Sequence, residues 1–375
     1  MKEMENENKA ENSLEMRKSN IELLRIVAMF GIVIFHHFGT KMPNGMVALS
    51  EGFGKDSYFY DFVNNSTAGL DIKTLIFDFL FGHLGNGGNL IFMLITGYFL
   101  FGREFGIEKR VKAAKKVLCI TLFWGVVLAI VYGILAGFFY PMEGLPSYKP
   151  SFNLFSWLCD TNTWYLQAYG VFILLILPIL KYFESKIDKK KHWAIIVMLV
   201  ALCFFDYASF LPNIWISIYL LEFTLCYYIG GYIAKYPNDI SLWKLFAMFF
   251  GYMALYFVYE FAWRSSMRKM YEPHQYSYVS VMQPFICCLI YAVLLFMIFE
   301  KMNFKSKVIN RIAKATPGIY LFHFNLINTV YVIANTFWWK DWSLGGFCKF
   351  ILIDAVLLFA AGLLIDCVYP HRGRS

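Results

Sequence analysis

Long apolar stretches recur along the whole chain and are separated by short polar segments. Ten of these stretches approach the length of about 20 residues that a helix needs to cross a bilayer. They cover 21–38, 85–101, 117–138, 164–181, 192–210, 213–234, 243–262, 278–299, 317–334 and 347–369. The pattern predicts an all-α membrane protein built as a single polytopic bundle of about ten transmembrane helices.

The second span is preceded by a shorter apolar segment, 74–82, which is too short to cross the bilayer. Its Asp78 favours wet surroundings. We therefore expect an interfacial helix that leads into the span at 85–101.

The stretch 1–20 is polar and mixed in charge, which predicts a disordered cytoplasmic tail. No small-residue cleavage site follows the first apolar run, so we expect a retained helix and not a signal peptide. No Pro/Gly-rich linker divides the rest. Residues 21–369 are expected to form one transmembrane domain, and 370–375 a short cytoplasmic tail.

The distribution of basic residues predicts the orientation of the spans. With the N-terminus inside, 24 of the 34 Lys and Arg residues fall on the cytoplasmic side and nine outside. Cytoplasmic segments carry such an excess. Both termini are therefore expected in the cytoplasm.

Composition supports a bilayer as the solvent. The chain is 59% hydrophobic and 16% charged, whereas soluble domains have roughly 45–50% and 25%. The net charge of +8 is spread in patches beside the spans that are too small for a nucleic-acid face, so no nucleic-acid partner is expected.

Cysteine spacing gives no sign of a metal site. The eight cysteines include no C-x-x-C pair and no zinc-like spacing to histidine. Most lie inside apolar runs, where a thiol acts as a small hydrophobe. No metal is expected.

Four ionisable residues lie in the first span, where each costs about 2.5–3.5 kcal/mol on insertion scales. Glu22 and Arg25 are neighbours on a helix surface. Arg25 and His36 are separated by a rotation about 20° past three full turns, so they share one face about 16 Å apart along the axis. The fourth is His37. The set favours a function, although an interfacial ion pair and interfacial histidines would also explain it.

These residues carry a family resemblance. NIELLRIVAMFGIVIFHH (20–37) resembles the opening helix of the acyltransferase-3 family of integral membrane acyltransferases, with Glu22 where Asp is commoner. Thr96 likewise replaces a Ser of the family pattern. Four further segments match in order: GGNLIFMLITGYFLFGRE (87–104), the basic stretch 109–116, NTWYLQAYGVFILLILP (162–178) and TPGIYLFHFNLI (316–327). The resemblance covers about residues 20–369.

The resemblance implies an O-acyltransferase of the bacterial cell membrane. Such an enzyme transfers an acyl group, usually acetyl, from acyl-CoA to a hydroxyl of a cell-surface polysaccharide or its lipid-linked precursor. Acyl-CoA is then a donor substrate, and no bound cofactor is expected. The expected partners are the lipid bilayer, acyl-CoA and a carbohydrate or glycolipid acceptor.

The chemistry of the first span agrees with this implication. A hydroxyl is a poor nucleophile at neutral pH, and a neutral imidazole at His36 is suited to take its proton. The forked guanidinium of Arg25 can hold a phosphate or carbonyl oxygen, and Glu22 can orient it. These three are the candidate catalytic residues.

Basic residues after the second span are candidates for binding the donor. Arg103, Arg110 and Lys115 lie on the predicted cytoplasmic side, where the phosphates of CoA would arrive. The positive-inside rule alone would also explain them.

Candidate acceptor-binding residues are Trp164, Tyr165, His323 and His37. The two aromatic rings stand at the predicted outer mouth of the fourth span, where they could stack on a sugar or simply anchor the helix in the interface. His323 could equally be a buried hydrogen-bonding residue. Glu222, inside the sixth span, is expected to need a partner.

A transporter or flippase for a glycolipid or small solute is the alternative, because buried charges also mark transport paths. The two halves of the chain share no visible pattern and the Glu-Arg-His set occurs once, which favours the enzyme. The other large class of membrane-bound acyltransferases relies on a histidine within a span and an upstream Asn or Asp, and it is disfavoured because His36 lies in the first span.

Overall fold

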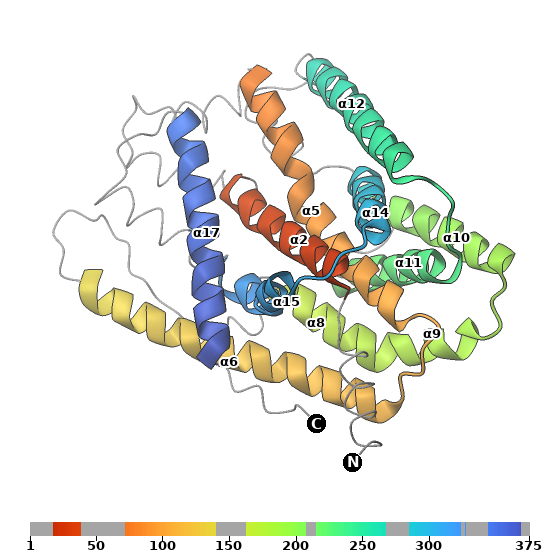
Figure 1. The fold of residues 1–375 in the computed structure, drawn as a ribbon, viewed down its shortest axis with the longest axis horizontal. Coiled ribbons are helices and arrows are strands. Elements are labelled where there is room, and N and C mark those ends of the chain that lie inside the picture. Colours follow the sequence, from red (N-terminus) through yellow and green to blue (C-terminus); the bar gives the residue numbers. More distant parts are fainter. Residues whose placement is uncertain are drawn as a thin grey trace.

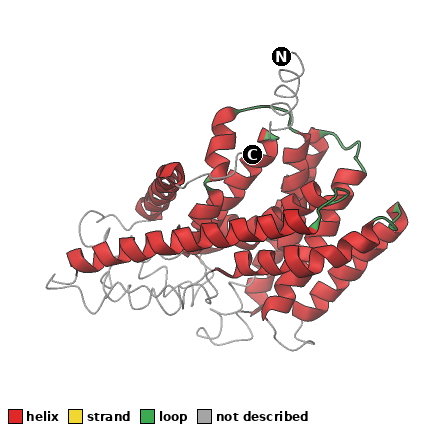
Figure 2. Cartoon of the chain, turned by 90° about the horizontal axis from the view of Figure 1, so that it is seen from below, coloured by secondary structure: helices red, strands yellow, loops and turns green. Residues whose placement is uncertain are grey.

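The computed structural model describes residues 18–38, 72–139, 163–207, 215–267, 285–323, 327 and 344–368. Every regular element in these ranges is a helix (Figure 2). The elements are α2 (Ser19–Phe38), α5 (Ile72–Leu100), α6 (Ile107–Phe139), α8 (Trp164–Val171), the π-helix η3 (Phe172–Ile176), α9 (Leu177–Glu184), α10 (Lys189–Tyr207), α11 (Trp215–Lys235), α12 (Leu242–Met267), α14 (Phe285–Lys301), α15 (Lys307–Lys314) and α17 (Leu344–Val368). Residues 316–323 are helical as well. The predicted all-α class is confirmed.

Apolar side chains cover exposed faces of the outer helices. Along α6, which forms one edge of the molecule in Figure 1, an exposed residue recurs at every fourth position. These are Leu118, Leu122, Val126, Ile130 and Ile134. Four of the described helical stretches are long and apolar enough to cross a membrane: Ser19–His36, Ile107–Ile134, Trp164–Glu184 and Leu242–Tyr259. The exposed apolar stripe of α6 fits contact with lipid and not with water.

Each predicted span coincides with a helix wherever the structure describes it. The separate interfacial helix at 74–82 is wrong, because α5 runs without a break for 29 residues. Glycines in its middle cost about 1 kcal/mol each in helix propensity. A Cβ at Gly88 would lie 2.8 Å from the carbonyl oxygen of Ala28 in α2. Close packing of α2 on α5 therefore sustains a helix that local propensity would interrupt.

The helix α2 lies between two hydrophobic clusters. Its first half places Ile21 and Leu24 in a cluster with α5, α11 and α14. Its second half places Ile32 and Val33 in a cluster with α6, residues 316–323 and α17. The candidate catalytic helix is thus held from both sides, at the centre of the molecule in Figure 1.

The helices α5 and α11 approach until their backbones touch. A Cβ at Gly97 would lie 2.5 Å from the carbonyl oxygen of Tyr227, and one at Gly230 would meet the backbone of α5 in the same way. Small residues permit this approach. The glycine in the ITGYF segment therefore has a packing role.

The fourth predicted span is not uniform, because a π-helix separates α8 from α9. Pro178 follows it and has no N–H to donate to the preceding turn. A π-bulge accommodates such a missing bond and rotates the helix that follows. This places α9 with Lys181 and Glu184 facing the end of α5.

The start of α2 is anchored by hydrogen bonds. The helix begins at Ser19, inside the stretch 1–20 that was expected to be a tail, and residues 1–17 lie outside the described part. Asn20 donates its side-chain amide to the carbonyl oxygen of Phe299 at 2.8 Å. Ser306 donates its backbone N–H to the Ser19 hydroxyl at 2.8 Å. These buried contacts order the two residues that sequence polarity assigned to the tail.

Helix ends that share the predicted cytoplasmic side lie together. Three lysines join them in addition to the contacts of Ser19 and Asn20. They are Lys18 bonded to the Tyr98 hydroxyl, Lys235 to the Ile187 carbonyl and Lys301 to the Asn238 carbonyl. The arrangement is what an alternation of spans across one bilayer requires.

Candidate active site

The first candidate residues lie on one uninterrupted helix. Because α2 runs from Ser19 to Phe38 without a break, Arg25 and His36 keep their common face and their axial separation of about 16 Å. His37 belongs to the same helix, but its side chain lies outside the described part. The helix therefore carries a cation in its first half and an imidazole near its other end.

The structure brings His323 to His36. Their Nε2 and Nδ1 atoms are 2.8 Å apart, although 287 residues separate them in the chain. The ring centroids are 4.8 Å apart at 45°. His323 is 1% exposed. Sequence reasoning gave His323 a second catalytic, an acceptor-binding or a structural role and did not place it beside His36.

The backbone around His323 decides where the protons of this pair lie. Nδ1 of His323 is 2.8 Å from the carbonyl oxygen of Tyr320 and 3.1 Å from that of Ile319. Carbonyl oxygens only accept, so Nδ1 carries the hydrogen and a neutral His323 has its lone pair on Nε2. His36 must then donate through Nδ1. A neutral His36 consequently has its basic lone pair on Nε2, the form that a general base needs.

The segment that holds His323 packs tightly on α6. A Cβ at Gly318 would lie 2.3 Å from Trp124, so only glycine fits there. The Trp124 ring stacks on Phe322, with centroids 4.7 Å apart and planes 21° apart. The glycine of the GIYLFH segment thus lets the indole fix the turn that carries His323.

Arg25 has donors available for a ligand. Its Nη1 is 3.7 Å from Glu22 Oε1, which is a loose ion pair with a 4% exposed carboxylate. Its Nε is buried and has no hydrogen-bond partner among the described residues. The charge of Arg25 acts on Tyr165 and Tyr169 of α8. An unsatisfied buried donor is suited to bind a polar substrate group.

The candidate acceptor residues on α8 are part of an aromatic cluster. Trp164 stacks on Tyr219 of α11, with centroids 3.8 Å apart. Tyr165 packs against Tyr320 at 5.6 Å and so connects α8 to the segment of His323. One face of the Trp164 ring is therefore occupied by protein. A role of both residues in sugar stacking stays a prediction.

The candidate donor residues do not form one group. Arg103 follows α5 and lines a pocket of about 560 Å³, together with Lys181 and Lys235. Arg110 and Lys115 do not line this pocket. They lie on α6, which begins at Ile107, so the basic stretch 109–116 is helical and not a loop. Donor binding by these residues stays a prediction.

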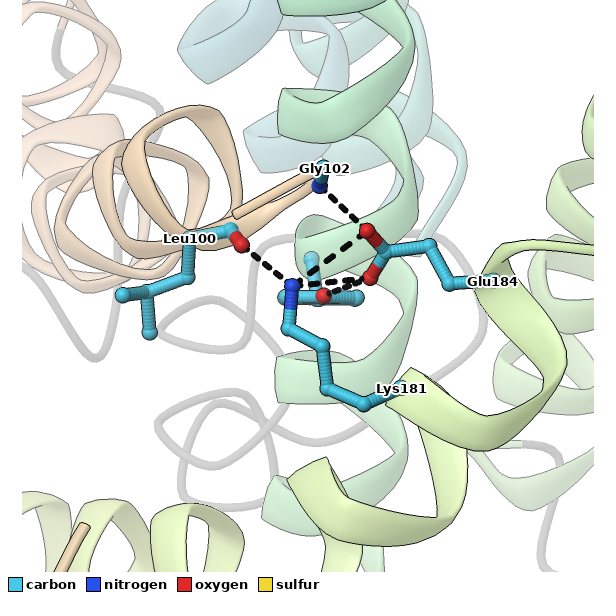
Figure 3. Close-up of polar contacts among 5 residues, drawn as sticks. Leu100, Gly102, Lys181 and Glu184 are labelled. Atoms are coloured by element: carbon cyan, nitrogen blue, oxygen red, sulfur yellow. Dashed lines mark hydrogen bonds and ion pairs between the residues drawn. The ribbon is translucent and has the colours of Figure 1, made fainter. Parts of the chain in front are cut away.

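A buried network at this pocket was not predicted. The Glu184 carboxylate is 2.9 Å from the Lys181 ammonium and also accepts from the Gly102 N–H and the Tyr227 hydroxyl. Lys181 donates in addition to the Leu100 carbonyl (Figure 3). In the sequence, these residues resembled ordinary charges at the end of a span.

Glu222 of α11 is 5% exposed, as its position inside a span predicted. Tyr219 and Cys226 lie one helical turn away on each side, within reach of its charge.

Comparison with known proteins gives the family. No curated protein and no solved structure matches the chain. The model of an acyltransferase domain, that of the acyltransferase-3 family, matches residues 18–365, which include α2 and the His323 segment. The match covers most of the 375 residues. The chain therefore belongs to the acyltransferase-3 family and is a membrane acyltransferase.

Proposed function

We propose that the protein is an O-acyltransferase that moves an acetyl or related acyl group from acyl-CoA to a hydroxyl of a cell-surface polysaccharide or its lipid-linked precursor. The observation that carries this proposal is the 2.8 Å contact of His323 with His36, which favours a basic Nε2 on His36. A hydroxyl acceptor requires such a base, because it must lose its proton as it attacks.

The reaction balances with these groups alone. The acceptor oxygen attacks the thioester carbonyl carbon while His36 Nε2 takes the hydroxyl proton. The His36 imidazolium then donates a stronger, charge-assisted bond through Nδ1 to His323 Nε2. When the tetrahedral intermediate collapses, the C–S bond breaks and the proton on Nε2 passes to the leaving thiolate. The products are the O-acyl ester and CoA.

Arg25 is assigned to the donor. Its unpartnered Nε and loosely paired Nη1 can hold a phosphate or the amide linker of CoA. The separation of about 16 Å from Arg25 to His36 is comparable with an extended pantetheine arm. The arm can therefore lie along α2, with its thioester at His36.

The proposal places the chain in the plasma membrane of a bacterium, with both termini and the donor on the cytoplasmic side. Support comes from the excess of basic residues at the helix ends that lie together. Reporter fusions at residues 110 and 188 should read cytoplasmic, and one at residue 150 external. An external signal at residue 188 would contradict this orientation.

The test of function is product formation by the purified protein. We expect labelled acetyl-CoA to give acetyl esters on members of a panel of bacterial surface oligosaccharides. His36→Ala should lower transfer by about 10² or more and keep most acyl-CoA binding. Near-normal transfer by His36→Ala would refute the assigned base. Movement of oligosaccharide across proteoliposomes without a new ester would favour the transporter instead.

A further inference from the structure

We propose that the pocket at the end of α5 binds the nucleotide phosphates of the acyl donor, with Arg103 and Lys235 as the phosphate contacts. The inference rests on the proposed function and assigns a place on the protein to one part of its donor. It differs from the sequence prediction because Lys235 replaces Arg110 and Lys115.

The pocket has the size and position of a ligand site. Its volume of about 560 Å³ is within the range of about 300–1,000 Å³ of small-molecule sites. Its walls come from the Phe101–Gly106 connection, from α9 and from the last residue of α11. It lies at the end of the bundle where the predicted cytoplasmic helix ends meet, so a soluble donor can reach it.

The charge of Glu184 is satisfied inside the protein. This carboxylate is 8% exposed as a residue and accepts bonds from Lys181, the Gly102 N–H and the Tyr227 hydroxyl. Lys181 is held by the same carboxylate and by the Leu100 carbonyl (Figure 3). The network therefore fixes α9 against the end of α5, and the charges of Lys181 and Glu184 compensate each other.

The two other cations of the pocket are not compensated in this way. Arg103 and Lys235 are exposed, and neither forms an ion pair within the described part of the chain. Lys235 donates to the Ile187 carbonyl at 3.2 Å and lies over the rings of Tyr236 at 5.5 Å and Phe101 at 6.0 Å. Arg103 lies over the Phe99 ring at 5.9 Å. Each of these two side chains can therefore turn its charged N–H groups toward an anion. Glu104 is the one further acid of the lining.

A phosphate is the anion that fits this arrangement. The pocket offers a guanidinium fork and an ammonium, and these are the side chains that bind phosphoryl oxygens most often. Open space surrounds both ends of the Gly102–Gly106 connection, since a Cβ at either glycine would meet nothing within 4 Å. Arg25, deeper in α2, then remains for the linker of the donor.

The test measures binding by the full-length protein in neutral phosphatidylcholine nanodiscs. We expect Arg103→Ala and Lys235→Ala each to raise the Kd of CoA about three- to tenfold, less than for buried charges because the rim is exposed. The double variant should bind CoA more weakly than either single variant, and Lys235→Arg should retain CoA binding. The Kd of pantetheine, which lacks the nucleotide, should not change. Lys190→Ala, an exposed lysine at the same end of the bundle, is the control.

Several results would overturn the assignment. Unchanged CoA binding by the double variant would do so, as would an equal loss of pantetheine binding. A loss of CoA binding in Lys115→Ala alone would move the site to α6. A phospholipid headgroup carries the same chemistry, so reduced retention of phosphatidic acid with unchanged CoA binding would reject the donor as the ligand. Absence of CoA binding by the unmodified protein would refute the proposed function as well.

Discussion

Replacement of His323 by Phe tests the proton arrangement at the site. The change keeps an aromatic ring of similar shape on the buried helix and removes the acceptor that lies 2.8 Å from His36 Nδ1. A neutral hydrogen bond contributes about 0.5–1.5 kcal/mol and a charge-assisted one about 1.5–3 kcal/mol. The extra strength of the charge-assisted bond is present only once His36 has taken the proton. It therefore lowers the free energy of the transition state more than that of the bound substrates. The released His36 also loses its fixed tautomer.

Together these losses predict that kcat falls about 10- to 100-fold in His323→Phe, as for other residues that orient a functional imidazole. The KM for acyl-CoA should change little, because His323 does not lie with the candidate donor residues. The assay is the initial rate of ester formation over a range of acyl-CoA concentrations, with the melting temperature as a measure of folding. His83→Phe is the matched control, since His83 is also a buried histidine and packs on Tyr256 of α12.

A double-mutant cycle with His36→Ala tests whether His323 acts through His36. If His323 acts through His36, then His323→Phe should have almost no further effect once His36 is absent. Independent, additive losses would refute the proposed positioning role. So would a normal kcat in His323→Phe at a normal melting temperature.

Three further predictions follow from the packing and the charges. Arg25→Ala should weaken acyl-CoA binding and Arg25→Lys should rescue it only in part, because an ammonium lacks the fork; tight binding by Arg25→Ala would contradict its role. Gly97→Ala should lower the melting temperature, since overpacking costs about 1–3 kcal/mol, whereas Gly133→Ala, with open space around it, should not. Trp164→Ala should reduce use of the oligosaccharide acceptor and leave thioester hydrolysis nearly intact; equal loss of both activities at a normal protein level would count against stacking.

The sequence alone was sufficient for the class of the protein and for the helix face that Arg25 and His36 of the candidate site share. Apolar run length and basic-residue asymmetry depend on single segments and their contact with lipid or water, so they can be read without the fold. The common face of Arg25 and His36 follows from helix geometry over eleven residues, and α2 is unbroken across them.

Local rules failed where packing between distant helices decided the outcome. The shortness of the apolar segment 74–82 and its Asp78 suggested a separate interfacial helix, but close packing of α2 at glycines such as Gly88 supports one continuous α5. Helix propensity is worth only about 1 kcal/mol per residue, and tertiary contacts exceed it.

Tertiary structure alone brought His323 to His36 and Glu184 to the end of α5. Both contacts join segments far apart in the chain, and no periodicity within a segment encodes them. The proton positions of the histidine pair depend on two backbone carbonyls one turn earlier in the helix of His323. Sequence determines which side chains are able to donate or accept, whereas the direction of each hydrogen bond depends on the partners that the fold places within about 3 Å.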